Sequence, residues 1–337
     1  MPQTHSRRRK RRRSWPRTIL LLVFVFAALA AVYRILIHKP QLAAGSSQLS
    51  TSVQAGQAAA SAGPVSAGSV DPGPDRYARK DDFFTILVSG MDNDNGGSDT
   101  NILVAFDAGE NAVHCVSIPR DSGVYYNGKA QKVNVPSKTS VRTLADTLAD
   151  TLGIPVDFTV QVDLKGFVKL VDAIGGVDFY VPENMDYDDP VQDLHIHFQE
   201  GMQHLSGTDA LKVVRFRHNN DDTGYGGRQD LGRIDTQQAF LKAVAKKMLS
   251  NPQKIGDYAK IFDTYVDTDL RVNELAWFGE QAILMGLDAI QFSTLPGEWS
   301  GSRSLYLLDG EAVLELVNDS LNPYLIDRTA DDLNLVS

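Results

Sequence analysis

The sequence predicts one folded domain of the layered α/β or α+β type, preceded by a single transmembrane helix. From residue 83 onward, apolar runs of strand length alternate with segments of helical periodicity. An apolar stretch at 18–37 is long enough to cross the hydrocarbon core of a bilayer as a helix. The chain of 337 residues could form one large domain or two small ones, and no change of composition after residue 80 marks a second.

The N-terminal segment has the pattern of a signal anchor. Residues 1–17 hold eight basic side chains and no acid, and the only charge within 18–37 is Arg34, which can snorkel to the interface. The positive-inside rule places residues 1–17 in the cytoplasm and the chain after residue 40 on the extracytoplasmic side of the cell membrane. A cleaved signal peptide is the alternative, because alanine-rich sequence follows at Ala43 and Ala44.

Charge is unevenly distributed along the chain. The whole chain has a net charge of −9, so the part after the basic tail has a net charge of −17. A basic tail can bind nucleic acid, but this one carries no folded reader and adjoins the membrane helix, so we expect no nucleic-acid partner. Residues 38–80, rich in Ala, Gly, Ser and Pro, are predicted to be a flexible linker to a domain at 81–325.

The predicted elements follow from apolar periodicity. Three apolar strands begin at Phe83, Ile102 and Ala112, and Gly153 is a plausible helix C-cap. Further strands are expected at 156–162, 177–181, 195–198 and 290–295, and helices at 137–153, 164–174, 208–217, 233–249, 255–263, 272–286 and 309–321.

Charged residues follow the first three strands, where loops can bring side chains together. The stretch 92–99 is not a helix–loop–helix calcium site, because Gly96 and Leu103 occupy the positions that need acids. It could be a polar turn stabilised by Asp and Asn side chains. The functional interpretation is that Asp92 and Asp99 bind Mg²⁺ together with phosphate oxygens.

Several arginines could bind a diphosphate. Arg120 ends the third strand, Arg215 and Arg217 are two residues apart, and Arg228 or Arg233 lies downstream. The planar guanidinium group matches phosphate oxygens in a bidentate manner. The alternative is that these arginines pair with the many acids of the domain surface. The set indicates a site only if it shares one cleft with Asp92 and Asp99.

Other reactive residues give weaker signals. His195 and His197 could bind zinc from one face of a strand, but no third ligand stands at a recognisable spacing, which favours an exposed edge strand. Cys115, the only cysteine, lies in an apolar strand and is interpreted as a buried hydrophobic residue. No nucleophile elbow, P-loop or dinucleotide fingerprint is present.

Seven ordered motifs within residues 83–250 resemble those of the LytR–CpsA–Psr family, and the short tail and single membrane helix are also similar to it. Each motif is weak alone, but their order is specific. The motifs are Ser98–Thr100, Ser117–Asp121, Lys132–Asn134, Leu170–Val177, Leu205–Leu211, Arg215–Arg217 and Gly232–Gln238.

The resemblance implies a single α/β/α-layered extracytoplasmic domain with a central mixed sheet. It also implies a phosphotransferase that moves a glycopolymer, such as teichoic acid or capsule, from a polyprenyl-diphosphate carrier to peptidoglycan through a phosphodiester bond. The lipid tail would occupy an apolar tunnel. Mg²⁺, with Mn²⁺ as an alternative, would bind at Asp92 and Asp99. The implied diphosphate-binding residues are Arg120, Lys132, Arg215, Arg217, Arg233 and Gln237.

The chain departs from the family pattern in two places. Thr236 stands where an arginine commonly precedes the paired glutamines, and a long loop makes the choice of Arg233 over Arg228 a matter of alignment. Arg120 is expected to act in catalysis, and Asp121 or Asp230 could accept the proton of the acceptor hydroxyl. A diphosphate hydrolase using the same site, and a non-catalytic regulator or wall-binding module, are the alternative functions.

Overall fold

The computed structural model describes residues 37–42, 77–91 and 97–337. The predicted cytoplasmic tail, all but the last residue of the predicted membrane helix, most of the predicted linker and Asp92 lie outside these ranges. Within the described ranges, no helix combines the length and the apolar character needed to span a bilayer. The chain divides into two units at residues 39 and 40; residues 37–39 of the first contain no helix or strand, and the second holds the fold.

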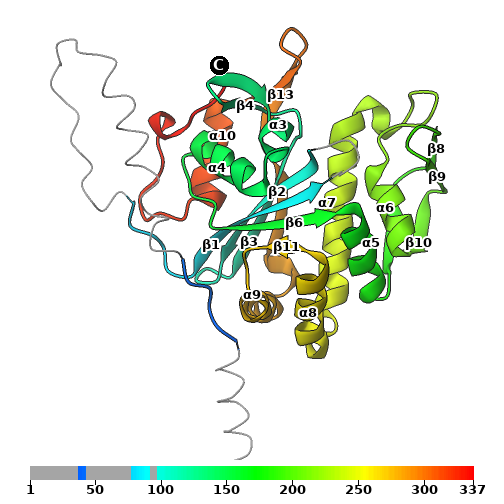
Figure 1. Cartoon of the computed structure of the whole chain (residues 1–337), viewed down its shortest axis with the longest axis horizontal. Helices are drawn as coiled ribbons and strands as arrows, with labels where there is room; N and C mark the ends of the chain where they lie inside the picture. The colour runs from blue at the N-terminus through cyan, green and yellow to red at the C-terminus, as the bar shows by residue number, and fades with distance from the viewer. Residues whose placement is uncertain (1–36, 43–76, 92–96) are drawn as a thin grey trace, which may run out of the picture. The chain divides into compact units, whose positions relative to one another are not determined.

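The centre of the second unit is a six-stranded mixed sheet (Figure 1). β1 pairs with β2 in antiparallel and with β6 in parallel orientation, and β3 pairs with β12 in parallel orientation. The order across the sheet is β11 (Asp267–Thr268), β6 (Phe158–Asp163), β1 (Phe83–Met91), β2 (Ser98–Asp107), β3 (Ala112–Ile118) and β12 (Ile290–Thr294).

One face of the sheet packs against α4 (Val141–Leu152), α10 (Gly310–Leu316) and the π-helical turn Val317–Leu321. Leu87 and Leu103 of the sheet are fully buried against this layer. The Ser140 hydroxyl caps the start of α4 by accepting a hydrogen bond from the backbone N–H of Thr143. At its end Gly153 has φ of +66°, which an L side chain rarely adopts.

The opposite face packs against α8 (Ile255–Tyr265) and α9 (Val272–Met285). Ile86 neighbours Leu87 in β1 but belongs to this second core, since successive strand residues point to opposite faces. Phe278 of α9 meets Phe84 and Phe106 edge-to-face, with ring centroids 5.5 and 4.9 Å apart. The prediction of an α/β/α-layered domain with a central mixed sheet is confirmed.

A smaller lobe lies beside the end of the sheet where β1 and β6 terminate (Figure 1). It has its own core, in which Phe179, Ile196, Phe216 and Phe240 are buried. Its parts are α5 (Leu164–Ala173), α6 (Gly207–Arg215), α7 (Gln229–Leu249), the hairpin β7 (Val177–Val181) with β10 (Gly201–Leu205), and the hairpin β8 (Met185–Asp189) with β9 (Leu194–Phe198).

Three short elements surround the start of α4 and the end of the chain. They are the helix α3 (Asn134–Ser137), the hairpin β4 (Gly123–Tyr126) with β5 (Lys129–Lys132), and the hairpin β13 (Gly297–Ser300) with β14 (Leu305–Leu308).

The folded domain extends beyond the predicted boundaries 81–325. Before it, both terminal nitrogens of Arg79 donate to the buried Asp157 carboxylate, at 2.8 and 2.7 Å. After it, Leu335 forms an isolated β-bridge with Val124, and Val336 is buried. Composition alone did not reveal these contacts, because they join residues far apart in the sequence.

Candidate active site

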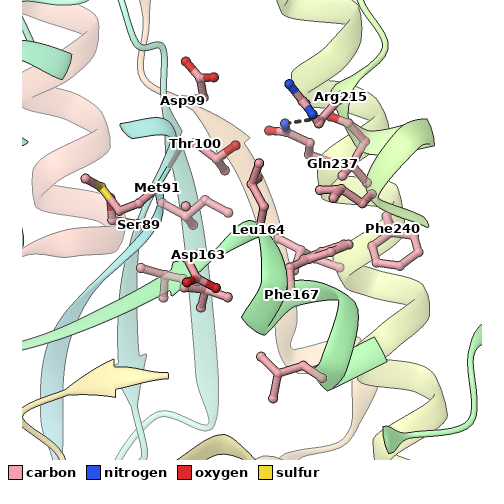
Figure 2. A pocket seen from close by; sticks show the side chains of 18 of the residues that line it. Ser89, Met91, Asp99, Thr100, Asp163, Leu164, Phe167, Arg215, Gln237 and Phe240 are labelled. Atoms are coloured by element: carbon pink, nitrogen blue, oxygen red, sulfur yellow. Dashed lines mark hydrogen bonds between the residues drawn. The ribbon is translucent and has the colours of Figure 1, made fainter. Parts of the chain in front are cut away.

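A pocket of about 780 Å³ lies between the sheet end and the small lobe. This size is typical of ligand-binding pockets. Its deep wall is largely apolar: in Figure 2, Phe167 and Phe240 lie below Asp99, Arg215 and Gln237. The apolar lining comes from Val88, Val160, Val162, Phe167, Leu170, Val171, Ile174, Leu211, Phe240, Leu241, Val244, Met248, Ile261 and Phe262.

One end of this pocket is strongly basic. The structure brings six predicted site residues to its wall from four parts of the chain: Asp99, Arg120, Arg215, Arg217, Arg233 and Gln237. In Figure 2, Asp99 and Arg215 lie on facing sides of the upper part of the pocket. The arginines therefore share one cleft with Asp99, which meets the expected condition for that one of the two acids. Asp92 lies outside the described residues.

Arg120 connects the acidic and basic sides of the site. Its Nη1 lies 2.5 Å from Oδ1 of Asp99, at the start of β2. Its Nε lies 3.8 Å from Oδ1 of Asp121, and that oxygen is 2.8 Å from Nζ of Lys132. Asp121 and Lys132 do not line the pocket. Arg120, at the pocket wall, therefore contacts Asp99 on one side and Asp121 on the other, and Lys132 pairs with Asp121.

Arg217 and Arg233 share a single carboxylate. Oδ1 of Asp230 lies 2.8 Å from Nη2 of Arg233 and 3.4 Å from Nε of Arg217. Arg233 is 4% exposed, and burial lowers its pKa to about 10 although Asp230 opposes this effect. The side chain therefore remains charged at neutral pH. Its buried Nε has no hydrogen-bond partner among the described residues, which leaves a donor for an anionic ligand.

Arg228 does not belong to this cluster. Its side chain is 59% exposed, and Nη1 pairs with Oδ2 of Asp235 at 2.9 Å; neither residue lines the pocket. Arg228 lies immediately before α7, whereas Arg233 lies five residues later, within the helix and facing inward. The structure thus places Arg233, and not Arg228, in the site.

Arg215 and Gln237 complete the wall on the side of the small lobe. Arg215 is the last residue of α6, and its Nη2 donates to Oε1 of Gln192 at 2.8 Å. Gln237 Nε2 donates to the carbonyl of Val214 at 3.0 Å, which ties α7 to the end of α6. The neighbouring Gln238 instead bonds the sheet through Ser117, with 3.0 Å between Nε2 and Oγ.

Thr236, which replaces the usual family arginine, does not face the pocket. It is buried, and its hydroxyl lies 2.8 Å from the hydroxyl of Tyr225. Burial raises the pKa of Tyr225 to about 12, so its hydroxyl stays protonated. A Cβ on Gly232 would lie 2.2 Å from Cγ of Tyr225, so Tyr225 packs against Gly232 as well. An arginine at position 236 would have to displace the Tyr225 ring from its place beside residue 236.

Some pocket residues were not anticipated. α8 contributes Tyr258 and Phe262, the turn between β8 and β9 contributes Gln192, and Lys138 follows α3. No motif marks these residues, since α8 and α3 reach the pocket through long-range packing. The residues after 250, whose role the sequence left open, thus form part of the apolar wall.

Comparisons with known proteins identify the family. A sequence model described as the LytR_cpsA_psr family matches residues 44–322. The chain belongs to the LytR–CpsA–Psr family. The resemblance seen in the seven motifs is thereby confirmed.

Two relatives are about a third identical to this chain over the aligned residues. TagV of Bacillus subtilis strain 168, a polyisoprenyl-teichoic acid–peptidoglycan teichoic acid transferase, is 31% identical over 266 residues, 74% of this chain and 66% of TagV. TagU of Bacillus cereus, with the same activity in its name, is 32% identical over 204 residues, 58% of this chain and 63% of TagU. The chain thus spans slightly less than two thirds of the length of these relatives.

The fold comparison agrees with the family assignment. The crystal structure of B. subtilis TagV aligns with a TM-score of 0.60 and 28% identity, and the alignment covers 70% of this chain and 95% of that one. The central mixed sheet is thus shared with a solved member of the family.

Proposed function

We propose that this protein transfers a glycopolymer from a polyprenyl-diphosphate carrier to peptidoglycan and forms a phosphodiester bond. One observation carries the proposal: a deep apolar pocket whose open end is ringed by four arginines. An apolar tail and a doubly charged headgroup together match such a pocket. The names of TagV and TagU, which act on polyisoprenyl-linked teichoic acid and peptidoglycan, support the same class of substrates.

The proposed reaction is a displacement at phosphorus. The oxygen of a muramic acid hydroxyl attacks the phosphorus that carries the glycan, and the bond from that phosphorus to the bridging oxygen breaks. Polyprenyl phosphate leaves with the bond electrons, and the hydroxyl loses its proton. In such transfers catalysis is mostly positioning and charge neutralisation. Arg120, Arg215, Arg217 and Arg233 would supply the positive charge.

Asp99 is the residue that suits Mg²⁺ or Mn²⁺. Its carboxylate is 43% exposed at the pocket wall, so water and phosphate oxygens can complete a hard-oxygen shell. Asp92, which lies between β1 and β2 in the sequence, is the second proposed ligand. A bound divalent ion would neutralise charge on the phosphates.

Asp121 and Asp230 remain the candidate proton acceptors. Both lie behind the arginines rather than in the pocket wall, and each is already paired with cations. Their contacts support a positioning role: Asp230 orients Arg217 and Arg233, and Asp121 orients Arg120 with Lys132.

The pattern of residues 1–37 supports an anchor in the cell membrane, with the catalytic domain on the extracytoplasmic side. A tether of this kind keeps the domain beside a lipid-linked donor, and the linker allows it to reach the wall.

The test is a transfer reaction with the detergent-purified full chain. A polyprenyl-diphosphate-linked saccharide, peptidoglycan oligomers and Mg²⁺ are mixed, and the products are identified by mass spectrometry. We expect a glycan–phosphate–muropeptide adduct that disappears with chelator and with Arg120→Ala, but persists with Arg228→Ala, which removes an exposed arginine outside the pocket. Free glycan phosphate without adduct would indicate a hydrolase, and adduct formation by Arg120→Ala would contradict the proposed site.

A further inference from the structure

The β8–β9 hairpin has two chemically different faces. Tyr187 and Leu194 point inward and line the pocket. The outward positions alternate with these and carry only charged or titratable side chains, which are exposed. Those positions are Asp186 and Asp188 on β8, and His195 and His197 on β9.

The strand register pairs each acid with a histidine. Asp188 faces His195 and Asp186 faces His197 across the antiparallel ladder. Oδ1 of Asp188 contacts Nδ1 of His195 and lies 3.4 Å from Nε2 of His197. The same Asp188 oxygen therefore lies close to one ring nitrogen of each imidazole. No third metal ligand was recognised near the two histidines in the sequence. The fold supplies one, Asp188, from the facing strand β8.

We propose that His195, His197 and Asp188 form a surface site for a divalent transition metal, with zinc as the best match. One ligand atom from each of the three residues lies within 4.8 Å of the others. In tetrahedral zinc sites nitrogen and oxygen ligands lie about 3.3 Å apart, given metal–ligand distances of about 2.0–2.1 Å. The 3.4 Å between Asp188 and His197 already meets this spacing, and water would fill the fourth position.

The surroundings of the two imidazoles favour metal binding over simple ion pairing. The second ring nitrogen of His197, Nδ1, lies 2.8 Å from Oδ1 of Asp186. The second nitrogen of His195, Nε2, lies 3.5 Å from Oδ1 of Asp193. A carboxylate on the far nitrogen is the arrangement that orients metal-bound histidines and raises their basicity. When both histidines are neutral, the carboxylates of Asp186, Asp188 and Asp193 give this cluster a net negative charge, which attracts a cation.

A matched pair elsewhere in the lobe lacks these features. His204 of β10 faces Asp178 of β7, with 2.6 Å between Nδ1 and Oδ1, and both are exposed. No second imidazole or third ligand joins them among the described residues. His204 therefore serves as a control with the same local chemistry and only two ligands.

A bound metal would affect the pocket through the turn of the same hairpin. Gln192 lies in that turn, lines the pocket and accepts a hydrogen bond from Arg215. Cross-linking β8 to β9 on the outer face would hold the turn, and with it Gln192, in place against Arg215. The metal is thus proposed as a structural clamp on one wall of the site.

Zinc binding can be measured without any transfer reaction. The full chain and its variants are dialysed against buffered ZnCl₂ at neutral pH, and bound zinc is counted by mass spectrometry. We expect one zinc per wild-type chain that is lost or weakened more than 10-fold in His195→Ala and in His197→Ala, and retained in His204→Ala. Asp186→Asn keeps all three ligands and should weaken binding roughly 10-fold, as loss of an orienting carboxylate does. Circular dichroism confirms that each variant is folded.

Metal spectroscopy adds a second readout. Co²⁺ should give the visible absorption of a tetrahedral nitrogen and oxygen site. Absence of stoichiometric zinc in the wild-type chain, or equal binding by folded His195→Ala and His204→Ala, would overturn the proposal.

Discussion

The contact between α5 and α6 depends on a glycine. A Cβ on Gly207, the first residue of α6, would lie 2.1 Å from the carbonyl oxygen and 2.8 Å from the carbonyl carbon of Val168 in α5. Normal contact begins at about 3.5 Å, so Gly207→Ala requires the two backbones to separate by roughly 1 Å. These helices form one wall of the pocket through Phe167 and Leu211.

The expected effect is a loss of stability. Overpacking of this kind costs about 1–3 kcal/mol, and the better helix propensity of alanine offsets about 1 kcal/mol of that cost. The net cost of up to about 2 kcal/mol corresponds to a Tm decrease of up to about 8 °C for a domain of this size. Thermal unfolding followed by circular dichroism measures this shift.

Gly256 provides the matched control. It lies in α8, and its Cβ would have no heavy atom within 4 Å, nor does it need a positive φ. Gly256→Ala should therefore leave Tm unchanged or raise it by a few degrees, because alanine is the better helix former by up to about 1 kcal/mol. A Gly207→Ala protein with Tm at or above that of the wild type would refute the reasoning from the close helix contact.

Three further predictions concern buried or paired groups. Asp157→Asn should lower the free energy of unfolding by about 3–5 kcal/mol in urea titrations, because it leaves Arg79 without its buried partner; a loss below 1 kcal/mol would show that the pair does not hold the domain start. Asp230→Asn should reduce transfer more than 10-fold in a folded protein, since it releases Arg233; unchanged transfer would exclude a role in positioning. Desolvation raises the pKa of the partly buried Cys115 thiol to about 12, so iodoacetamide at pH 8 should label the folded chain much more slowly than the unfolded chain; equally rapid labelling of both would contradict that raised pKa.

The sequence predicted the layered core because its elements are long and periodic. Leu144, Leu148 and Leu152 recur at helical spacing, and all three are buried in α4. The hairpins β4–β5, β8–β9 and β13–β14 were missed as pairs because their strands are only four or five residues long. Such short strands form because they pack against the rest of the domain, and the local sequence does not show that packing.

The candidate site was predictable as a set of residue types but not as a geometry. The motifs selected Arg215, Arg217 and Arg233, yet only the fold brings them to Arg120. The choice between Arg228 and Arg233 depends on helical phase, because α7 begins at Gln229 and not at Arg233 as the periodicity suggested. Asp230 contacts two arginines from the first turn of α7, a segment that the sequence analysis had assigned to a loop.

The proposed function requires the arginine-ringed pocket to bind a lipid diphosphate. The most direct measurement is the affinity of the full chain for polyprenyl diphosphate by isothermal titration calorimetry, with Arg215→Ala and Arg228→Ala compared. Each variant removes one arginine that has one carbonyl or carboxylate partner, but only Arg215 lines the pocket. We predict at least 10-fold weaker binding for Arg215→Ala and a change below twofold for Arg228→Ala. Equal weakening in both variants, or no binding by the wild-type chain, would contradict the claim.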